Sequence, residues 1–265
     1  MARRRSRGNT RKAVMALVVA LLAGALGIAT DGSAPILQRL GLPAETTAGA
    51  ADQSGREAES ARTLASIPAY GDSPYVYIAA DGDHPQGAPV FTDTELARAA
   101  SGAFESYSPL DALGRCGTAL ACVGRETMPT AERGDIGSVH PTGWRQRFYD
   151  FVDDRALYNR CHLIAHALAG EDANAQNLIT GTRYMNTQGM LPFEEQVAGY
   201  IDRTGNHVLY RVTPIFSGDE LVARGVHMEA RSVEDDGAGV RLNVYCYNVE
   251  PGVGIDYATG DSWAE

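Results

Sequence analysis

Three stretches rich in Val, Tyr and Thr fill the C-terminal part of the chain and limit its possible folds: residues 207–216, 221–233 and 240–249. In the last of them Leu242, Val244 and Cys246 alternate with polar neighbours, the pattern of a strand with one apolar face. β-Branched and aromatic side chains favour strands, and the short polar segment 217–220 can join two antiparallel neighbours. The sequence therefore predicts an antiparallel sheet.

Two helices and one short strand are predicted beside this sheet. Residues 192–203 begin with a proline and are followed by Gly205, which is the punctuation expected at the two ends of a helix. Residues 92–103 carry acidic residues early, which favours a helix start. The Tyr-Val-Tyr-Ile run at 75–78 is typical of a short strand.

The middle of the chain is less regular. Residues 107–143 are punctuated by Gly and Pro and are predicted to form a long connection that is either functional or pinned by a disulfide. A strand is predicted over 144–151 and a short helix over 162–169, with Gly170 as its C-cap. Together these elements predict an α+β domain in which helices flank an antiparallel sheet.

The N-terminus is typical of an export signal. Residues 1–12 are rich in Arg, and residues 13–29 form an apolar run of about 17 residues. That length lies between a signal core and a spanning helix of ~20 residues, so cleavage near Ala34 and retention as a membrane anchor both stay open. The protein is thus expected to be secreted or anchored to the outer face of the cell membrane, with residues 1–34 as signal peptide or anchor.

Two further segments follow. Residues 35–69 are rich in Ala, Gly, Ser, Thr and Glu and are predicted to be a disordered linker, because they offer little apolar surface to bury. Residues 70–265 are long enough for a single domain with its own core.

The charge of the chain argues against a simple basic nucleic-acid binder. The formal net charge is -10, and removal of residues 1–34, which contain six basic residues and Asp31, leaves about -15. Overall repulsion lowers the affinity for a polyanion. Eight arginines nevertheless fall between residues 110 and 185, where nine acidic residues accompany them. A local positive groove therefore depends on how the chain folds.

Four cysteines in an exported chain favour disulfides. Three pairings are possible, and one of them joins Cys116 to Cys122 and Cys161 to Cys246. A zinc site is the competing interpretation, but these spacings match no compact zinc-binding pattern.

The residues that carry chemistry gather between Tyr158 and Glu194. They comprise an imidazole, an arginine, several amides and a carboxylate, namely Asn159, Arg160, His162, Asn177, Asn186 and Glu194. A histidine can take a proton from water, and amide and carboxylate oxygens can hold a hydrated hard cation. Phosphodiester cleavage requires this combination.

Four runs around these residues resemble the DNA/RNA non-specific endonuclease family, and within it the DNA-entry nuclease and streptodornase branch. The runs are 159–164, 176–182, 184–186 and 192–194, and the likeness continues through 110–115, 208–214 and 256–260. The resemblance covers most of residues 105–262. It implies a ββα-metal active site and a metal-dependent endonuclease that hydrolyses DNA, with RNA as a second candidate substrate, and leaves 5'-phosphate ends.

The resemblance also implies roles for individual residues. His162 is the general base and Asn186 the ligand of one divalent cation, Mg²⁺ with Mn²⁺ as an alternative. Glu194 orients the water molecules around the cation and Arg160 clamps the phosphate. The family's motif has aspartate and glycine where this chain has Asn159 and Cys161.

The remaining expectations concern supporting groups. Asn177 is expected to brace the loop rather than contact substrate, and with Asn159 it supports the site. Nucleic acid is the expected partner, with no small-molecule cofactor.

Two other functions compete with this interpretation. Asn159 in place of aspartate, together with the acidic charge, is compatible with a catalytically inactive cell-surface DNA receptor on the same fold. His162 and His166 have the spacing of zinc-protease ligands, but Leu163 follows the first histidine where such a protease needs a glutamate. His166 is therefore expected to pack at a helix surface.

Overall fold

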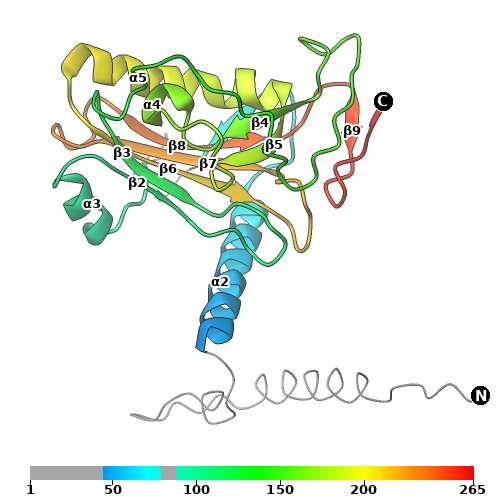
Figure 1. Cartoon of the computed structure of the whole chain (residues 1–265), viewed down its shortest axis with the longest axis horizontal. Coiled ribbons are helices and arrows are strands. Elements are labelled where there is room, and N and C mark those ends of the chain that lie inside the picture. The colour runs from blue at the N-terminus through cyan, green and yellow to red at the C-terminus, as the bar shows by residue number, and fades with distance from the viewer. Residues whose placement is uncertain (1–43, 79–87) are drawn as a thin grey trace, which may run out of the picture. The chain divides into compact units, whose positions relative to one another are not determined.

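A computed structural model describes residues 44–78 and 88–265 of the chain (Figure 1). The chain divides into two compact units, Met1–Ala48 and Gly49–Glu265. Every strand of the described residues lies in the second unit. The helices are α2 (Ala44–Ser66), α3 (Asp93–Ala99), α4 (His166–Ala169), the π-helix η2 (Met185–Met190) and α5 (Leu191–Thr204). The strands are β1 (Tyr75–Tyr77), β2 (Phe104–Tyr107), β3 (Ala119–Val123), β4 (Tyr158–His162), β5 (Leu178–Thr182), β6 (Val208–Ile215), β7 (Gly225–Ser232), β8 (Arg241–Tyr247), β9 (Val253–Ile255) and β10 (Ser262–Ala264).

The fold is α+β, as predicted from the sequence. A six-stranded sheet has the order β1-β8-β7-β6-β3-β2, and each of its neighbouring pairs is antiparallel. Its three longest strands, β6, β7 and β8, correspond to the three stretches rich in Val, Tyr and Thr. Two further antiparallel pairs, β4 with β5 and β9 with β10, form small sheets of their own.

The main core lies between the large sheet and the helices α4, η2 and α5, which Figure 1 shows on one face of the sheet. Val197 and Ile201 of α5 pack there with Tyr210 of β6 and Met228 of β7, and all four are buried. Because α5 is anchored by this face, the segment that precedes it, η2, is held in a defined position above the sheet.

The prediction of a helix over 192–203 is confirmed by α5. Proline lies in its first turn, and its last turn closes on Gly205, whose φ of 73° is the left-handed conformation that glycine adopts without strain. The predicted helix over 92–103 is present but shorter. Thr92 and Glu95 form a capping box at its start, and the chain leaves the helix after Ala99 because residues 104–107 pair with β3 as β2.

Two predictions for the middle of the chain are wrong. The connection over 107–143 contains β3, whose short run Ala-Leu-Ala-Cys-Val is buried between β2 and β6 and therefore lacks a polar alternation. Residues 144–151 form no strand. Phe148 makes a single β-bridge there, to Ala156. The stretch runs over the surface, and no strand in the described part of the chain lies beside it to extend the pairing.

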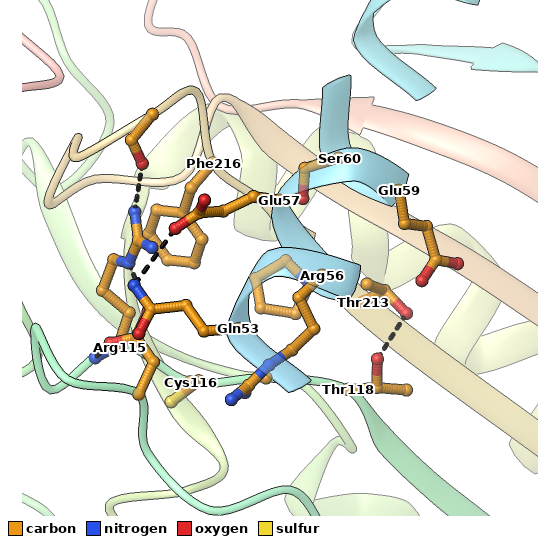
Figure 2. Close-up of a pocket in the computed structure, with 14 residues that line it drawn as sticks. Gln53, Arg56, Glu57, Glu59, Ser60, Arg115, Cys116, Thr118, Thr213 and Phe216 are labelled. Atoms are coloured by element: carbon orange, nitrogen blue, oxygen red, sulfur yellow. Dashed lines mark hydrogen bonds and ion pairs between the residues drawn. The ribbon is translucent and has the colours of Figure 1, made fainter. Parts of the chain in front are cut away.

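Helix α2 occupies part of the segment predicted to be a disordered linker. Its Ala, Glu and Arg residues favour helix, and two apolar residues near its end, Leu64 and Ile67, pack against Ile215 and Tyr245. Figure 2 shows Arg56 of α2 among the residues that line a cavity of about 40 Å³, to which residues 111–118 and the end of β6 also contribute. The tertiary contacts explain why a segment with little apolar surface is ordered. The division into segments 1–34, 35–69 and 70–265 otherwise stays a prediction.

The predicted disulfides are wrong. All four cysteines fall in the described part of the chain, and all four are buried free thiols. Cys116 and Cys122 belong to different apolar clusters although they are close in sequence. Cys161 instead contacts Asn186, and Cys246 contacts Met228. Cys161 and Cys246 lie in the same apolar cluster, yet both are free thiols.

None of the helices within 44–78 and 88–265 combines the length and the apolar content of a membrane span. The predicted signal or anchor at residues 1–34, including the apolar run 13–29, lies outside the described residues.

Candidate active site

The β4–β5 hairpin places His162. This residue is the last of β4 and pairs with Leu178 of β5, so the prediction that a helix starts at 162 is wrong. Residues 158–162 are held as a strand by their pairing with β5, and α4 begins only at His166, although Gly170 caps it as predicted, with φ 66°. The strand β4 therefore carries the imidazole, and a loop and the short helix α4 follow it.

A cleft of about 560 Å³ opens beside this hairpin. It brings together five of the six predicted site residues, from β4, η2 and α5. The residues that line it are Arg133, Ile136, Asn159, Arg160, His162, Ala165, His166, Ala167, Arg183, Asn186, Leu191 and Glu194. Residues 162 and 186, which are far apart in the sequence, thus share one cavity.

The hydrogen bonds of His162 define which nitrogen is basic. Nε2 lies 3.1 Å from the backbone carbonyl of Asp172, which can only accept, so Nε2 carries the hydrogen. Nδ1 lies 3.0 Å from Nη2 of Arg133, which can only donate, so Nδ1 presents its lone pair. The imidazole is thus held as the tautomer with its hydrogen on Nε2 and its lone pair on Nδ1, where the lone pair accepts from Arg133.

Burial, and next the positive charge of Arg133, lower the pKa of His162 to about 4. An imidazole with this pKa is neutral at pH 7, which is the form that can accept a proton.

Asn186 lies in the first turn of η2. In this π-helix the backbone N–H of Leu191 reaches back to the carbonyl of Asn186, a wider turn than in an α-helix. The side chain of Asn186 is half-buried and lines the cleft, where its Oδ1 accepts a hydrogen bond from the Cys161 thiol at 2.8 Å. The wide turn and the thiol together hold the amide at the cleft wall.

Glu194 follows in the first turn of α5. Burial, and next the Glu195 carboxylate, raise the pKa of Glu194 to about 8, although Arg133 lowers it. A carboxylate with this environment gains from a nearby cation, because a positive charge restores the stabilisation that burial removes. The buried hydroxyl of Tyr210, which interacts electrostatically with Glu194, has no hydrogen-bond partner within the described residues.

These groups fit a hydrated divalent cation. Asn186 and Glu194 offer oxygen ligands on one cleft, and the described residues contain no cluster of three or more His, Cys, Asp or Glu that could hold a metal by itself. A cation at this site would therefore keep most of its water, as Mg²⁺ commonly does.

Arg160 has its guanidinium engaged by the protein. Nη2 donates to the carbonyl of Gly137 at 2.9 Å, Nε donates to that of Val139, and the group stacks 4.3 Å from the ring centre of Trp144. These contacts hold the segment that also carries Arg133. Arg160 thus supports one wall of the cleft.

Asn177 lies away from the cleft and is fully buried. Its Oδ1 accepts from the backbone N–H of Ile164 at 2.8 Å, and its Nδ2 donates to the carbonyl of the same residue at 3.0 Å. The amide thereby holds the chain two residues after His162.

Seven of the residues that line the cleft were not predicted as site residues, and three of them, Arg133, His166 and Arg183, carry basic side chains. Arg133 lies in the long connection, where the sequence carries no local sign that it reaches His162. Arg183 precedes Asn186 by three residues, a helical spacing that brings side chains to one face and could have indicated it. His166, expected at a helix surface, lines the cleft and pairs with Asp172 at 3.3 Å.

Comparison with known proteins gives consistent results. The family described as DNA/RNA non-specific endonuclease matches residues 95–234. NucA from Streptococcus agalactiae with a magnesium ion bound has a TM-score of 0.55 and 30% identity, over 62% of this chain and 79% of that chain. Sda1 nuclease with a bound zinc ion has a TM-score of 0.53 and 26% identity, over 61% and 82% respectively. No curated protein matches the chain significantly.

Proposed function

The chain belongs to the DNA/RNA non-specific endonuclease family, and we propose that it is a secreted, metal-dependent endonuclease that cleaves DNA without sequence specificity and leaves 5'-phosphate ends. RNA is a second substrate of the same site, because contacts to phosphate carry little information about the base. The observation that carries the proposal is the shared cleft of His162, Asn186 and Glu194. The alternative of an inactive DNA receptor is not favoured.

His162 acts as the general base through Nδ1. Its Nε2–H is held by the Asp172 carbonyl, so the ring cannot turn away while Nδ1 takes a proton from the attacking water. The low pKa keeps the base neutral at working pH. In the structure the Arg133 guanidinium donates to Nδ1 of His162. When it binds the substrate phosphate instead, Nδ1 becomes free to accept a proton from water.

Asn186 would hold the cation through its amide oxygen, and Glu194 would accept hydrogen bonds from the water molecules around it. When bound, the cation supplies charge neutralisation at the phosphate and at the departing oxygen. We assign Mg²⁺ to the site, with Mn²⁺ as a substitute, since amide and carboxylate oxygens suit these hard cations. Among the solved relatives, NucA has magnesium bound and Sda1 has zinc.

Arg183 is a second phosphate contact. It lines the cleft and pairs with Asp153 and Asp154, at 3.1 and 2.6 Å, on the neighbouring loop. The two carboxylates hold the guanidinium in place, and a phosphate would compete with them for it. Arg160 contributes by holding the cleft wall through Gly137 and Val139.

Export places this activity outside the cell. The basic start and the apolar run at 13–29 support secretion, with anchorage at the outer face of the membrane if the run is retained.

The direct test is plasmid DNA with the purified protein and Mg²⁺. We expect degradation that EDTA stops and that His162→Ala lowers by at least about a hundredfold, since proton transfer contributes ~10²–10⁴. Thermal unfolding of the variant controls for its fold. Intact plasmid with tight binding would contradict the proposal.

A second test isolates the proton transfer. His162→Gly leaves space in which added imidazole can act as the base, so imidazole is expected to restore part of the activity. A folded variant that shows no recovery over a wide imidazole range would remove His162 from this role.

A further inference from the structure

Cys161 lies directly beneath the proposed cation site. It is fully buried, immediately precedes His162 in β4, and its Sγ is 2.8 Å from Oδ1 of Asn186. The same sulfur lies 3.7 Å from Sδ of Met190 at the other end of η2. The thiol therefore joins the strand of the general base to the π-helix of the metal ligand.

The surrounding chain makes room for this side chain. Gly181 of β5 lies beside it, and a Cβ added to that glycine would come within 2.8 Å of Cys161 Cβ and 2.7 Å of Met185 Cε. A larger residue at 181 would push the thiol or the first residue of η2 away. The absence of a side chain at Gly181 thus leaves the space in which the Cys161 side chain packs. In this position its sulfur contacts Asn186.

We propose that Cys161 is a positioning residue that orients the Asn186 carboxamide for the divalent cation. This inference rests on the proposed function of the cleft. The terminal torsion of an asparagine has a broad energy profile, so an unrestrained amide samples orientations that turn its NH₂ group toward a cation. A thiol donates weakly, and a carbonyl oxygen has two lone pairs, so Oδ1 can accept from Cys161 and still face a cation.

The contact stabilises one orientation before the cation arrives. A pre-oriented ligand loses less rotamer freedom on binding, which tightens the complex without adding a new bond to the metal. Loss of one weak hydrogen bond predicts an effect on cation affinity of about threefold to tenfold. Catalysis at saturating cation should change much less, because His162 is untouched.

The experiment compares Cys161→Ala with Cys161→Ser in the full-length protein. Mn²⁺ binding is titrated by electron paramagnetic resonance in the absence of nucleic acid, and the Mg²⁺ concentration for half-maximal cleavage is measured separately. We expect Cys161→Ala to weaken both by about threefold to tenfold. Cys161→Ser, which retains a donor, should stay within about twofold of wild type.

Cys246→Ala is the matched control. It also removes a buried thiol beneath η2, since the Cβ of Cys246 lies 3.3 Å from the position that a Cβ added to Gly189 would take. The sulfur of Cys246, however, contacts Met228 and not Asn186. If loosening of the core beneath η2 were the cause, this control would lose cation affinity as much as Cys161→Ala. Such a result would overturn the inference.

Other outcomes also test the role of Cys161. Equal losses in the alanine and serine variants would show that the donor is not what matters, and would overturn the proposal. If Cys161→Ala does not fold, Cys161→Val fills the pocket without a donor and should show the same loss, whereas wild-type affinity would refute it. A wild-type protein that neither binds Mn²⁺ nor cleaves DNA would instead refute the proposed function.

Discussion

His162 keeps a neutral imidazole through its surroundings. Burial removes water from the ring, and the Arg133 guanidinium adds a positive charge next to Nδ1, so the protonated form is disfavoured twice. An ordinary histidine, with a pKa near ~6.5, would lose its basic form as the pH falls below neutrality. In this cleft the lowered pKa keeps the imidazole neutral in mildly acidic solution.

Replacing Arg133 by alanine tests this account. Since the positive charge lowers the pKa of His162, its removal should raise that pKa from about 4 toward the ordinary value, without reaching it because burial remains. NMR titration of the His162 ring, which does not depend on activity, measures the change. An unchanged or lower pKa would contradict the assigned cause.

At the scale of elements, the C-terminal end of α2 packs against the large sheet. Leu64 and Ile67 pack on residues of β6 and β8, and the hydroxyl of Tyr247 donates to the Pro68 carbonyl at 2.8 Å. A domain that starts at Tyr70 would leave this apolar surface uncovered.

A truncation can measure the contribution of α2. We expect a chain that starts at Tyr70 to lose about 2 kcal/mol relative to one that starts at Gly49, because two partly buried apolar side chains are removed. For a domain of this size the Tm should fall by about 4–8 °C. Differential scanning calorimetry of both chains provides the comparison, and equal Tm values would show that α2 does not stabilise the domain.

His207 ties together the segments that follow β3 and β7. Its Nε2 lies 2.8 Å from Glu126 and its Nδ1 2.5 Å from Glu234. The hydrogen bond with Glu234, and next that with Glu126, raise the pKa of His207, while the pKa values of both carboxyl groups are lowered.

The pH dependence of this triad has a definite sign. A raised histidine pKa stabilises the fold below ~6.5, and that stability is lost as the pH rises through the folded value. The lowered glutamate values stabilise above ~4.3 and are lost in stronger acid. His207→Gln should therefore lower the Tm more at pH 5.5 than at pH 9. Thermal melts at both pH values test this, and an equal loss would rule it out.

At the scale of the whole molecule, an acidic protein must bind a polyanion. The net charge is -10, yet Arg133, Arg160 and Arg183 line one cleft. The cleft arginines attract a phosphate at short range, whereas the net negative charge of the protein repels nucleic acid at long range. Physiological salt screens interactions between exposed charges beyond a Debye length of ~8–10 Å, so it weakens the repulsion first.

Cleavage should therefore depend on salt in two phases. Modest salt screens the long-range repulsion and speeds the reaction, and higher salt weakens the phosphate contacts and slows it. Initial rates from about 10 mM to 500 mM NaCl at fixed Mg²⁺ provide the measurement. A rate that only falls with salt would show that the overall charge has no influence.

Much of this protein could be foreseen from local patterns. The strands β6, β7 and β8 and helix α5 followed from side-chain alternation and from Pro and Gly at element ends, which are properties of neighbouring residues. The grouping of His162, Asn186 and Glu194 followed from a family resemblance. The strand β3, the free thiols and the order of α2 did not, because each depends on contacts with distant segments. Arg133 approaches His162 from 29 positions earlier, and no pattern of adjacent residues encodes such an approach. Long-range packing alone brings the two side chains together, and with burial this contact lowers the pKa of His162.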